Sequence, residues 1–105
     1  MYLFINNKNI LLKEAKTFKE KFMGLMGKTN IDYALLFRNN GIHTFFMKED
    51  IDVVLTDKNY NISYIYKSVK KNKIILPKKG VYYTFELPKN STKKLCIGDK
   101  LIIHN

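Results

Sequence analysis

The sequence of 105 residues has little of what marks exported, membrane-inserted or disulfide-stabilised proteins. No uninterrupted apolar run exceeds five residues, as in Tyr33–Phe37, whereas a membrane-spanning helix needs roughly 20. The first residues lack the basic start, apolar core and small-residue cleavage site of a signal peptide, so we expect a cytoplasmic protein. Cys96 is the only cysteine, which excludes an intramolecular disulfide and agrees with a reducing compartment.

Acidic residues and arginine are scarce. Nine acidic residues accompany 19 basic ones, the formal net charge is +10, and Arg38 is the only arginine. A surface this positive attracts polyanions such as RNA, DNA and anionic lipid headgroups. Lysine, however, binds phosphate as a point charge and lacks the bidentate contacts of arginine. The charge therefore has two interpretations: a nucleic-acid-binding surface, or the composition of an AT-rich coding sequence, which favours Lys, Asn, Ile, Tyr and Phe together.

Glycine and proline are also sparse, and no repeat or linker divides the chain, so residues 1–105 are expected to form a single domain. Short apolar and β-branched runs alternate with polar turn residues at near-regular spacing, a pattern typical of a small barrel or sandwich. The expected strands are residues 2–5, 10–14, 33–37, 42–47, 51–56, 62–66, 81–87 and 101–104, and residues 67–73 are expected to form a basic loop.

One short helix is expected after the second strand. Thr17 and Glu20 form a capping box, in which Thr17 accepts from the amide of Glu20 and Glu20 reaches back. Apolar residues from Phe18 to Met26 follow at helical spacing, and Gly27 provides a left-handed stop. Gly24 costs about 1 kcal/mol relative to alanine inside a helix, so we expect another group to approach the backbone there. The predicted fold is mainly β, a small α+β domain with a compact barrel- or sandwich-like antiparallel sheet and one short helix.

Three segments share their order and spacing with one family. They are Phe-Met-Gly-Leu-Met-Gly-Lys at 22–28, Ile-His-Thr-Phe-Phe-Met-Lys at 42–48 followed by an Asp-bearing strand at 51–57, and residues 81–91 with Glu-Leu-Pro at 86–88, later joined by Gly98 and Asp99. Across roughly residues 14–104 the chain resembles the family catalogued as domain of unknown function 192. The resemblance implies a compact, mostly β domain with one helix, and it implies no established activity, cofactor or partner.

The chain departs from the family pattern at four positions. Phe46 stands where the family usually has tryptophan, and Glu49 and Asp50 replace its less acidic pair. Asn90 replaces a turn glycine, which asparagine can do in part because it tolerates positive φ.

The side chains best able to carry chemistry lie between His43 and Asp57. Asp52 begins an apolar strand, and a carboxylate buried there needs a partner such as Lys48, Arg38 or His43. Two histidines without Cys-His spacing do not indicate a transition-metal site, and the acids lack the glycine and the spacing of a calcium loop. The candidate ligand-binding residues are His43, Thr44, Phe46, Lys48, Asp52 and Glu86.

Tyrosines and lysines offer a second candidate site. Tyr64 and Tyr66 share one face of a strand and lysines follow directly, which resembles the stacking platform and basic groove of single-strand binders. The alternative is a core face whose tyrosine hydroxyls reach solvent at the rim. The candidate nucleic-acid-binding residues are Tyr64, Tyr66, Lys67, Lys70, Lys71 and Lys73.

Three functional hypotheses follow from these sites. The first is a small, non-catalytic domain that binds an unknown ligand or protein near His43–Asp52. The second is binding of RNA or single-stranded nucleic acid through a lysine-rich face, and the third is an enzyme with His43, Lys48 and Asp52 at its site. The first is favoured because the sequence has no recognisable catalytic arrangement. We expect no catalytic residue, metal or cofactor, no membrane span, and a monomer, because lysines beside exposed strand edges discourage pairing.

Overall fold

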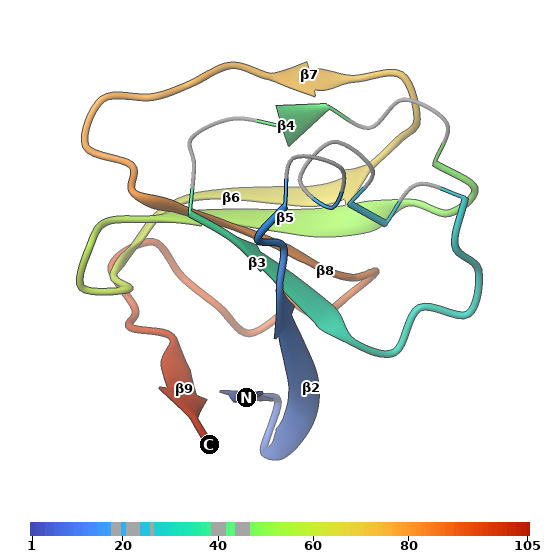
Figure 1. Ribbon diagram of the computed structural model, residues 1–105. Coiled ribbons are helices and arrows are strands. Elements are labelled where there is room, and N and C mark those ends of the chain that lie inside the picture. Colours follow the sequence, from blue (N-terminus) through green and yellow to red (C-terminus); the bar gives the residue numbers. More distant parts are fainter. Residues whose placement is uncertain (18–19, 21–23, 26, 39–41, 44–46) are drawn as a thin grey trace.

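Strands dominate the computed structural model, which describes residues 1–17, 20, 24–25, 27–38, 42–43 and 47–105, without the side chains of residues 42 and 43 (Figure 1). The strands are β1 (Tyr2–Ile5), β2 (Lys8–Glu14), β3 (Ala34–Phe37), β4 (Ile42–His43), β5 (Ile51–Thr56), β6 (Ile62–Val69), β7 (Ile74–Ile75), β8 (Tyr83–Pro88) and β9 (Ile102–His104). Within these residues, no helix is long and apolar enough to cross a membrane.

Seven of the strands form one curled sheet in the order β6-β5-β8-β3-β2-β1-β9 (Figure 1). Neighbouring strands pair antiparallel except β2 and β3, which run parallel with Leu12 opposite Ala34. β4 and β7 form a separate two-stranded ribbon, which Figure 1 shows above β5 and β6. The structure confirms the prediction of a mainly β, barrel-like domain, and it adds one parallel pair to the expected antiparallel sheet.

Side chains alternate between two apolar clusters on opposite faces of this sheet. On β5, for example, Val54 packs in the first cluster and Val53 in the second. β5 is buried along its whole length, because the clusters cover both of its faces. Residues from outside the strands of the large sheet close the second cluster, among them Leu25, Met47 and Ile75.

The predicted start of the helix is present. The amide of Glu20 donates to Thr17 Oγ1 at 3.0 Å, and the amide of Thr17 donates to Glu20 Oε1 at 2.9 Å, which confirms the capping box. Gly27 has φ of 73° and confirms the left-handed stop. Helical geometry among the described residues is confined to Glu20, and most of the remaining predicted helix lies at residues 18–19, 21–23 and 26, outside the described residues.

Asparagines occupy left-handed positions in two predicted turns. Asn6 and Asn7, between β1 and β2, have φ of 54° and 61°. Asn90 has φ of 70° in the turn after β8, so it adopts the conformation of the glycine that it replaces.

The region between β6 and β8 differs from the prediction. β6 continues to Val69, so Lys67 lies in a strand and not in the expected basic loop. Ile74 and Ile75 form β7, outside all of the predicted strands. A two-residue strand that pairs with an equally short partner has too few residues to produce a recognisable sequence pattern.

Candidate functional site

Asp52 is a buried anchor at the start of β5. Its side chain is among the least accessible polar groups, with 1% of the residue exposed. Oδ1 accepts from the amide of Ser68 at 2.9 Å, and Oδ2 accepts from the amide and the hydroxyl of Thr92 at 3.0 and 2.6 Å. Among the described side chains, neither Lys48 nor Arg38 forms an ion pair with it. The carboxylate therefore ties β5 to the end of β6 and to the turn after β8.

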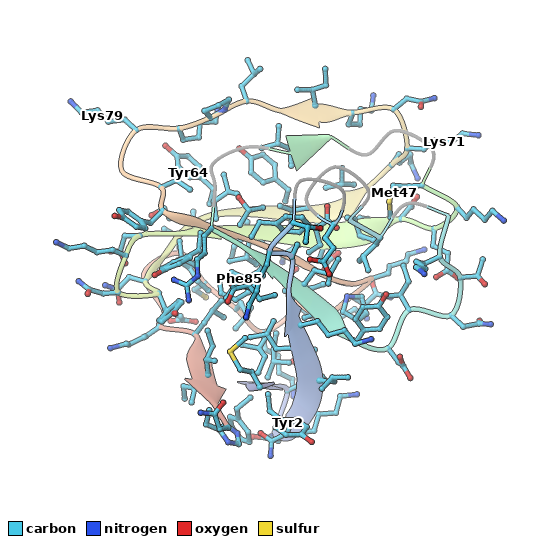
Figure 2. All side chains as sticks on the ribbon, in the orientation of Figure 1. Tyr2, Met47, Tyr64, Lys71, Lys79 and Phe85 are labelled. Atoms are coloured by element: carbon cyan, nitrogen blue, oxygen red, sulfur yellow. The ribbon has the colours of Figure 1, made fainter. Side chains whose placement is uncertain are left out.

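A hollow of about 400 Å³ opens where β5 begins and β6 ends. The two strands pair antiparallel with Ile51 opposite Val69, so the residues before β5 come to lie beside those after β6. Figure 2 shows Met47 and Lys71 on the same side of the molecule. The residues lining the hollow are Met47, Lys48, Glu49, Asp50, Lys70 and Lys71.

The hollow joins parts of the two candidate sites. Lys48 belongs to the predicted ligand-binding set, and Lys70 and Lys71 belong to the predicted nucleic-acid-binding set. Met47, Glu49 and Asp50 line the same hollow but belong to neither set. The pairing of β5 with β6, which the sequence does not reveal, brings the two segments together.

The charges around the hollow are only partly balanced within the chain. Lys70 Nζ lies 3.2 Å from Asp50 Oδ2, and Glu49 Oε1 accepts from the amide of Ile31 at 3.3 Å. Among the described residues, Lys48 and Lys71 form no ion pair, and both are exposed. Three lysines and two acids leave a net charge of +1 in the lining, so the site favours an anionic group.

Glu86 lies elsewhere, on the second face of the sheet under Gly24 and Leu25. It is 3% exposed, and its Oε1 accepts from the amide of Leu25 at 3.2 Å. Burial raises the pKa of Glu86 to about 8, and the Leu25 hydrogen bond opposes that rise only in part. At neutral pH the carboxyl group is therefore mainly protonated.

The approach to the Gly24 backbone that the sequence predicted is made by this carboxyl group. A Cβ atom at Gly24 would lie 2.7 Å from Glu86 Oε1 and would have to displace this buried carboxyl group, and the φ of 49° at Gly24 is itself strained for any other residue. Burial also raises the pKa of the neighbouring Tyr33, and the charges of Asp32 and Glu86 add to that effect.

The two tyrosines of β6 share a strand face, as predicted, and this face turns toward the second cluster. Tyr66 packs against that cluster and is half-buried. Tyr64 is 37% exposed, and Lys78 Nζ lies 5.9 Å from the centre of its ring. In Figure 2, Tyr64 is seen between β6 and β7. All four predicted lysines are exposed: Lys67 lies within this strand, and Lys70, Lys71 and Lys73 follow it.

Three residues of the predicted ligand-binding set lie wholly or partly outside the described residues. Thr44 and Phe46 lie outside the described residues, and only the backbone of His43 is described, opposite Ile74 in the β4–β7 ribbon. Asp52 and Glu86 are described, but neither lines the hollow. Across the described part of the chain, no group of three His, Cys, Asp or Glu side chains is arranged to hold a metal ion.

Comparison with known proteins identifies one family and several relatives. The model of domain of unknown function 192, described as "Uncharacterized ACR", matches residues 2–103. A UPF0127 protein of Thermococcus kodakarensis is 38% identical over 84 residues, which cover 73% of this chain and 53% of that protein. A UPF0127 protein of Pyrococcus horikoshii is 33% identical over 96 residues, covering 83% and 82% of the two chains. The chain spans about half the length of the Thermococcus relative.

Two crystal structures have a similar fold, each with a TM-score of 0.80. One is a protein of unknown function from Novosphingobium aromaticivorans, 12% identical, with 97% of this chain and 82% of that chain covered. The other, from Sinorhizobium meliloti, is described as a candidate transcription regulator; it is 18% identical, with 96% and 89% covered. At these identities the similarity shows the fold alone.

Proposed function

This chain belongs to the family of domain of unknown function 192, and we propose that it is a small, non-catalytic domain that binds an anionic ligand. The ligand binds in the hollow between residues 47–50 and residues 70–71. The observation that carries the proposal is the charge state of this hollow. Its two acids are engaged by Lys70 and by the Ile31 amide, while Lys48 and Lys71 form no ion pair in the described part of the chain.

The surroundings of the hollow favour binding over catalysis. An enzyme built on Lys48 and Asp52 would need both groups directed into one site. Asp52 instead accepts three hydrogen bonds from Ser68 and Thr92, so both of its carboxylate oxygens are used in structural hydrogen bonds. These bonds fix the ends of β5 and β6, so the walls of the hollow are preorganised, and preorganisation lowers the entropic cost of binding.

A titration with inorganic phosphate tests the proposal, followed through backbone amide chemical shifts. We expect the largest shifts at residues 48–50 and 70–71, with saturation. The double variant Lys48→Gln/Lys71→Gln should weaken binding at least about tenfold, because it removes the two lysines of the lining that form no ion pair with any described residue. The control Lys58→Gln/Lys93→Gln removes the same charge from exposed positions elsewhere and should change affinity about twofold or less.

Equal weakening by the two double variants would overturn the proposal, because it would show that phosphate responds only to net charge. A labelled single-stranded RNA measured with the same variants separates the remaining hypothesis. If RNA bound tightly near physiological salt and phosphate did not saturate the hollow, nucleic-acid binding would replace small-ligand binding.

A further inference from the structure

The segment of residues 70–79, which we name the basic strap, combines exposed lysines with exposed aliphatic side chains. β7 lies within it and pairs with β4, above the large sheet in Figure 1. Ile75 is 7% exposed and packs into the second cluster, which fixes the strap to the core. Ile74 and Leu76, on either side, are 60% and 64% exposed. An extended chain directs alternate side chains to opposite sides, so Ile74 and Leu76 project outward together.

All charged residues within the strap are basic, and Asp50, from the segment before β5, pairs with Lys70 at its first position. The strap contains five lysines: Lys70, Lys71, Lys73, Lys78 and Lys79. No acidic residue occurs anywhere between Asp57 and Glu86, so the sequence on both sides of the strap adds no negative charge of its own. Lys71 and Lys79 mark the two ends of the strap in Figure 2, with β7 between them.

This composition matches the surface of an anionic lipid bilayer better than it matches a nucleic acid. Sequence-tolerant binding of single strands relies on exposed aromatic faces and arginine. Here Tyr66 is half-buried, the Tyr64 ring lies near Lys78, and the outward side chains are aliphatic. Aliphatic side chains contribute favourable binding free energy when they enter the boundary between headgroups and acyl chains. Lysines around them add electrostatic attraction to the anionic headgroups.

We propose that the basic strap docks the protein on anionic lipid bilayers, with Ile74 and Leu76 entering the interface and the flanking lysines contacting headgroups. The inference goes beyond ligand binding in the hollow, because Ile74 and Leu76 do not line it. Membrane docking and phosphate binding can therefore fail separately.

Co-sedimentation of the full chain with vesicles tests the inference. The probes are vesicles of equal parts phosphatidylglycerol and phosphatidylcholine, and vesicles of phosphatidylcholine alone. We expect binding to the anionic vesicles only, weakened by salt. Ile74→Ser/Leu76→Ser should lower the partition coefficient at least about tenfold, because both side chains lose several buried methylene groups. Lys73→Gln/Lys79→Gln should lower it as well and reduce its dependence on salt.

A matched pair of exposed isoleucines provides the control. Ile97 and Ile102 are 68% and 56% exposed, and β9, which contains Ile102, lies at the opposite end of the molecule from β7 in Figure 1. Ile97→Ser/Ile102→Ser should leave vesicle binding unchanged. All of these side chains are exposed, so the urea unfolding midpoint should stay near that of the original chain and confirm that each variant is folded.

Three results would overturn the inference. The first is no binding to the anionic vesicles even at low salt. The second is an equal loss with the two serine pairs, which would mean that the strap has no special role. Tight binding of single-stranded RNA that depends on the lysines, but not on Ile74 and Leu76, would assign the strap to nucleic acid instead.

Discussion

Glu86 is an acidic residue whose burial disfavours its charged form. Its carboxyl group lies between the sheet and the Gly24–Leu25 turn, and among the described residues the Leu25 amide is its hydrogen-bond donor. One donor offsets only part of the cost of burying a charge, so the neutral acid is the form that the site favours. Protonation therefore contributes to the stability of the fold.

The stability of the protein should decrease as Glu86 loses its proton. The pKa of Glu86 is about 8 in the folded protein, against an ordinary value of 4.5, so between these values the folded state binds more protons than the unfolded state. The contribution is complete below about pH 4.5, declines as the pH rises, and is gone above about pH 8. Urea unfolding between about pH 5 and about pH 9 measures this decline. Glu86→Gln should flatten it, because the amide keeps an acceptor for Leu25 and does not ionise.

Two exposed acids provide an internal check on this pH dependence. Hydrogen bonds from backbone amides lower the pKa of Glu20 and of Asp57. Their contributions therefore increase with pH and are complete once the pH exceeds their ordinary values. A decline above about pH 5 is opposite in sign and belongs to Glu86. If Glu86→Gln retained the full decline, the assignment to Glu86 would be wrong.

Alanine substitutions at Gly24 and Gly27 distinguish the cost of backbone strain from the cost of side-chain crowding. Both have positive φ, so alanine should cost about 1 kcal/mol at either position. At Gly27 a Cβ atom meets nothing within 4 Å, whereas at Gly24 it lies 2.7 Å from Glu86 Oε1. We therefore expect Gly24→Ala to lower the free energy of unfolding by at least about 1 kcal/mol more than Gly27→Ala does. Equal losses in urea unfolding would show that Glu86 does not crowd this turn.

At the scale of elements, the side chain of Asp52 connects three segments, namely β5, the end of β6 and the turn after β8, where regular strand pairing is interrupted. β5 and β6 shift register between Ile51 and Val53, and Ser68 opposite this irregularity has φ of 50°. The ladder leaves the Ser68 amide to a side chain, and Asp52 accepts from it. The same carboxylate accepts from Thr92, so one side chain fixes the β5–β6 irregularity and the turn after β8 together.

Removing this carboxylate should affect the fold more than removing one of its donors. Asp52→Ala leaves two amides and a hydroxyl without their acceptor and should cost about 3 kcal/mol or more of unfolding free energy. Thr92→Val deletes only the hydroxyl bond of 2.6 Å and should cost about 1 kcal/mol. Urea unfolding of both variants measures the difference. A loss for Asp52→Ala no larger than that for Thr92→Val would contradict the anchoring role.

The sequence predicts the elements of this molecule better than their arrangement. Short apolar and β-branched runs identify β1, β5 and most of β6, and asparagines mark the turns between β1 and β2 and after β8. The parallel pairing of β2 with β3 is not predictable in this way, because it depends on how residues 15–33 return the chain across the sheet. The sequence also assigns Lys48 and Lys70 to separate candidate sites, because it does not reveal the register of β5 and β6 that brings them to one hollow.

At the scale of the whole molecule, the positive charge is widely spread but not featureless. Nitrogen-tipped side chains leave the molecule on several sides in Figure 2, so a net charge of +10 does not by itself define one binding face. The distinguishing feature is local: the acid-free stretch between Asp57 and Glu86 contains the basic strap and one wall of the hollow. Composition alone cannot locate such a feature, because the count of lysines says nothing of where acids are missing.

The pairing of β1 with β9 has a consequence for biosynthesis. Tyr2 lies opposite His104, so one side of the N-terminal hairpin is completed by a strand that the ribosome makes about a hundred residues later. Until residues 102–104 emerge, the edge of β1 that faces β9 presents unsatisfied backbone groups to solvent or to neighbouring nascent chains. Such late, sequence-distant pairing slows folding, so we expect chaperones to hold the nascent domain before its sheet is complete.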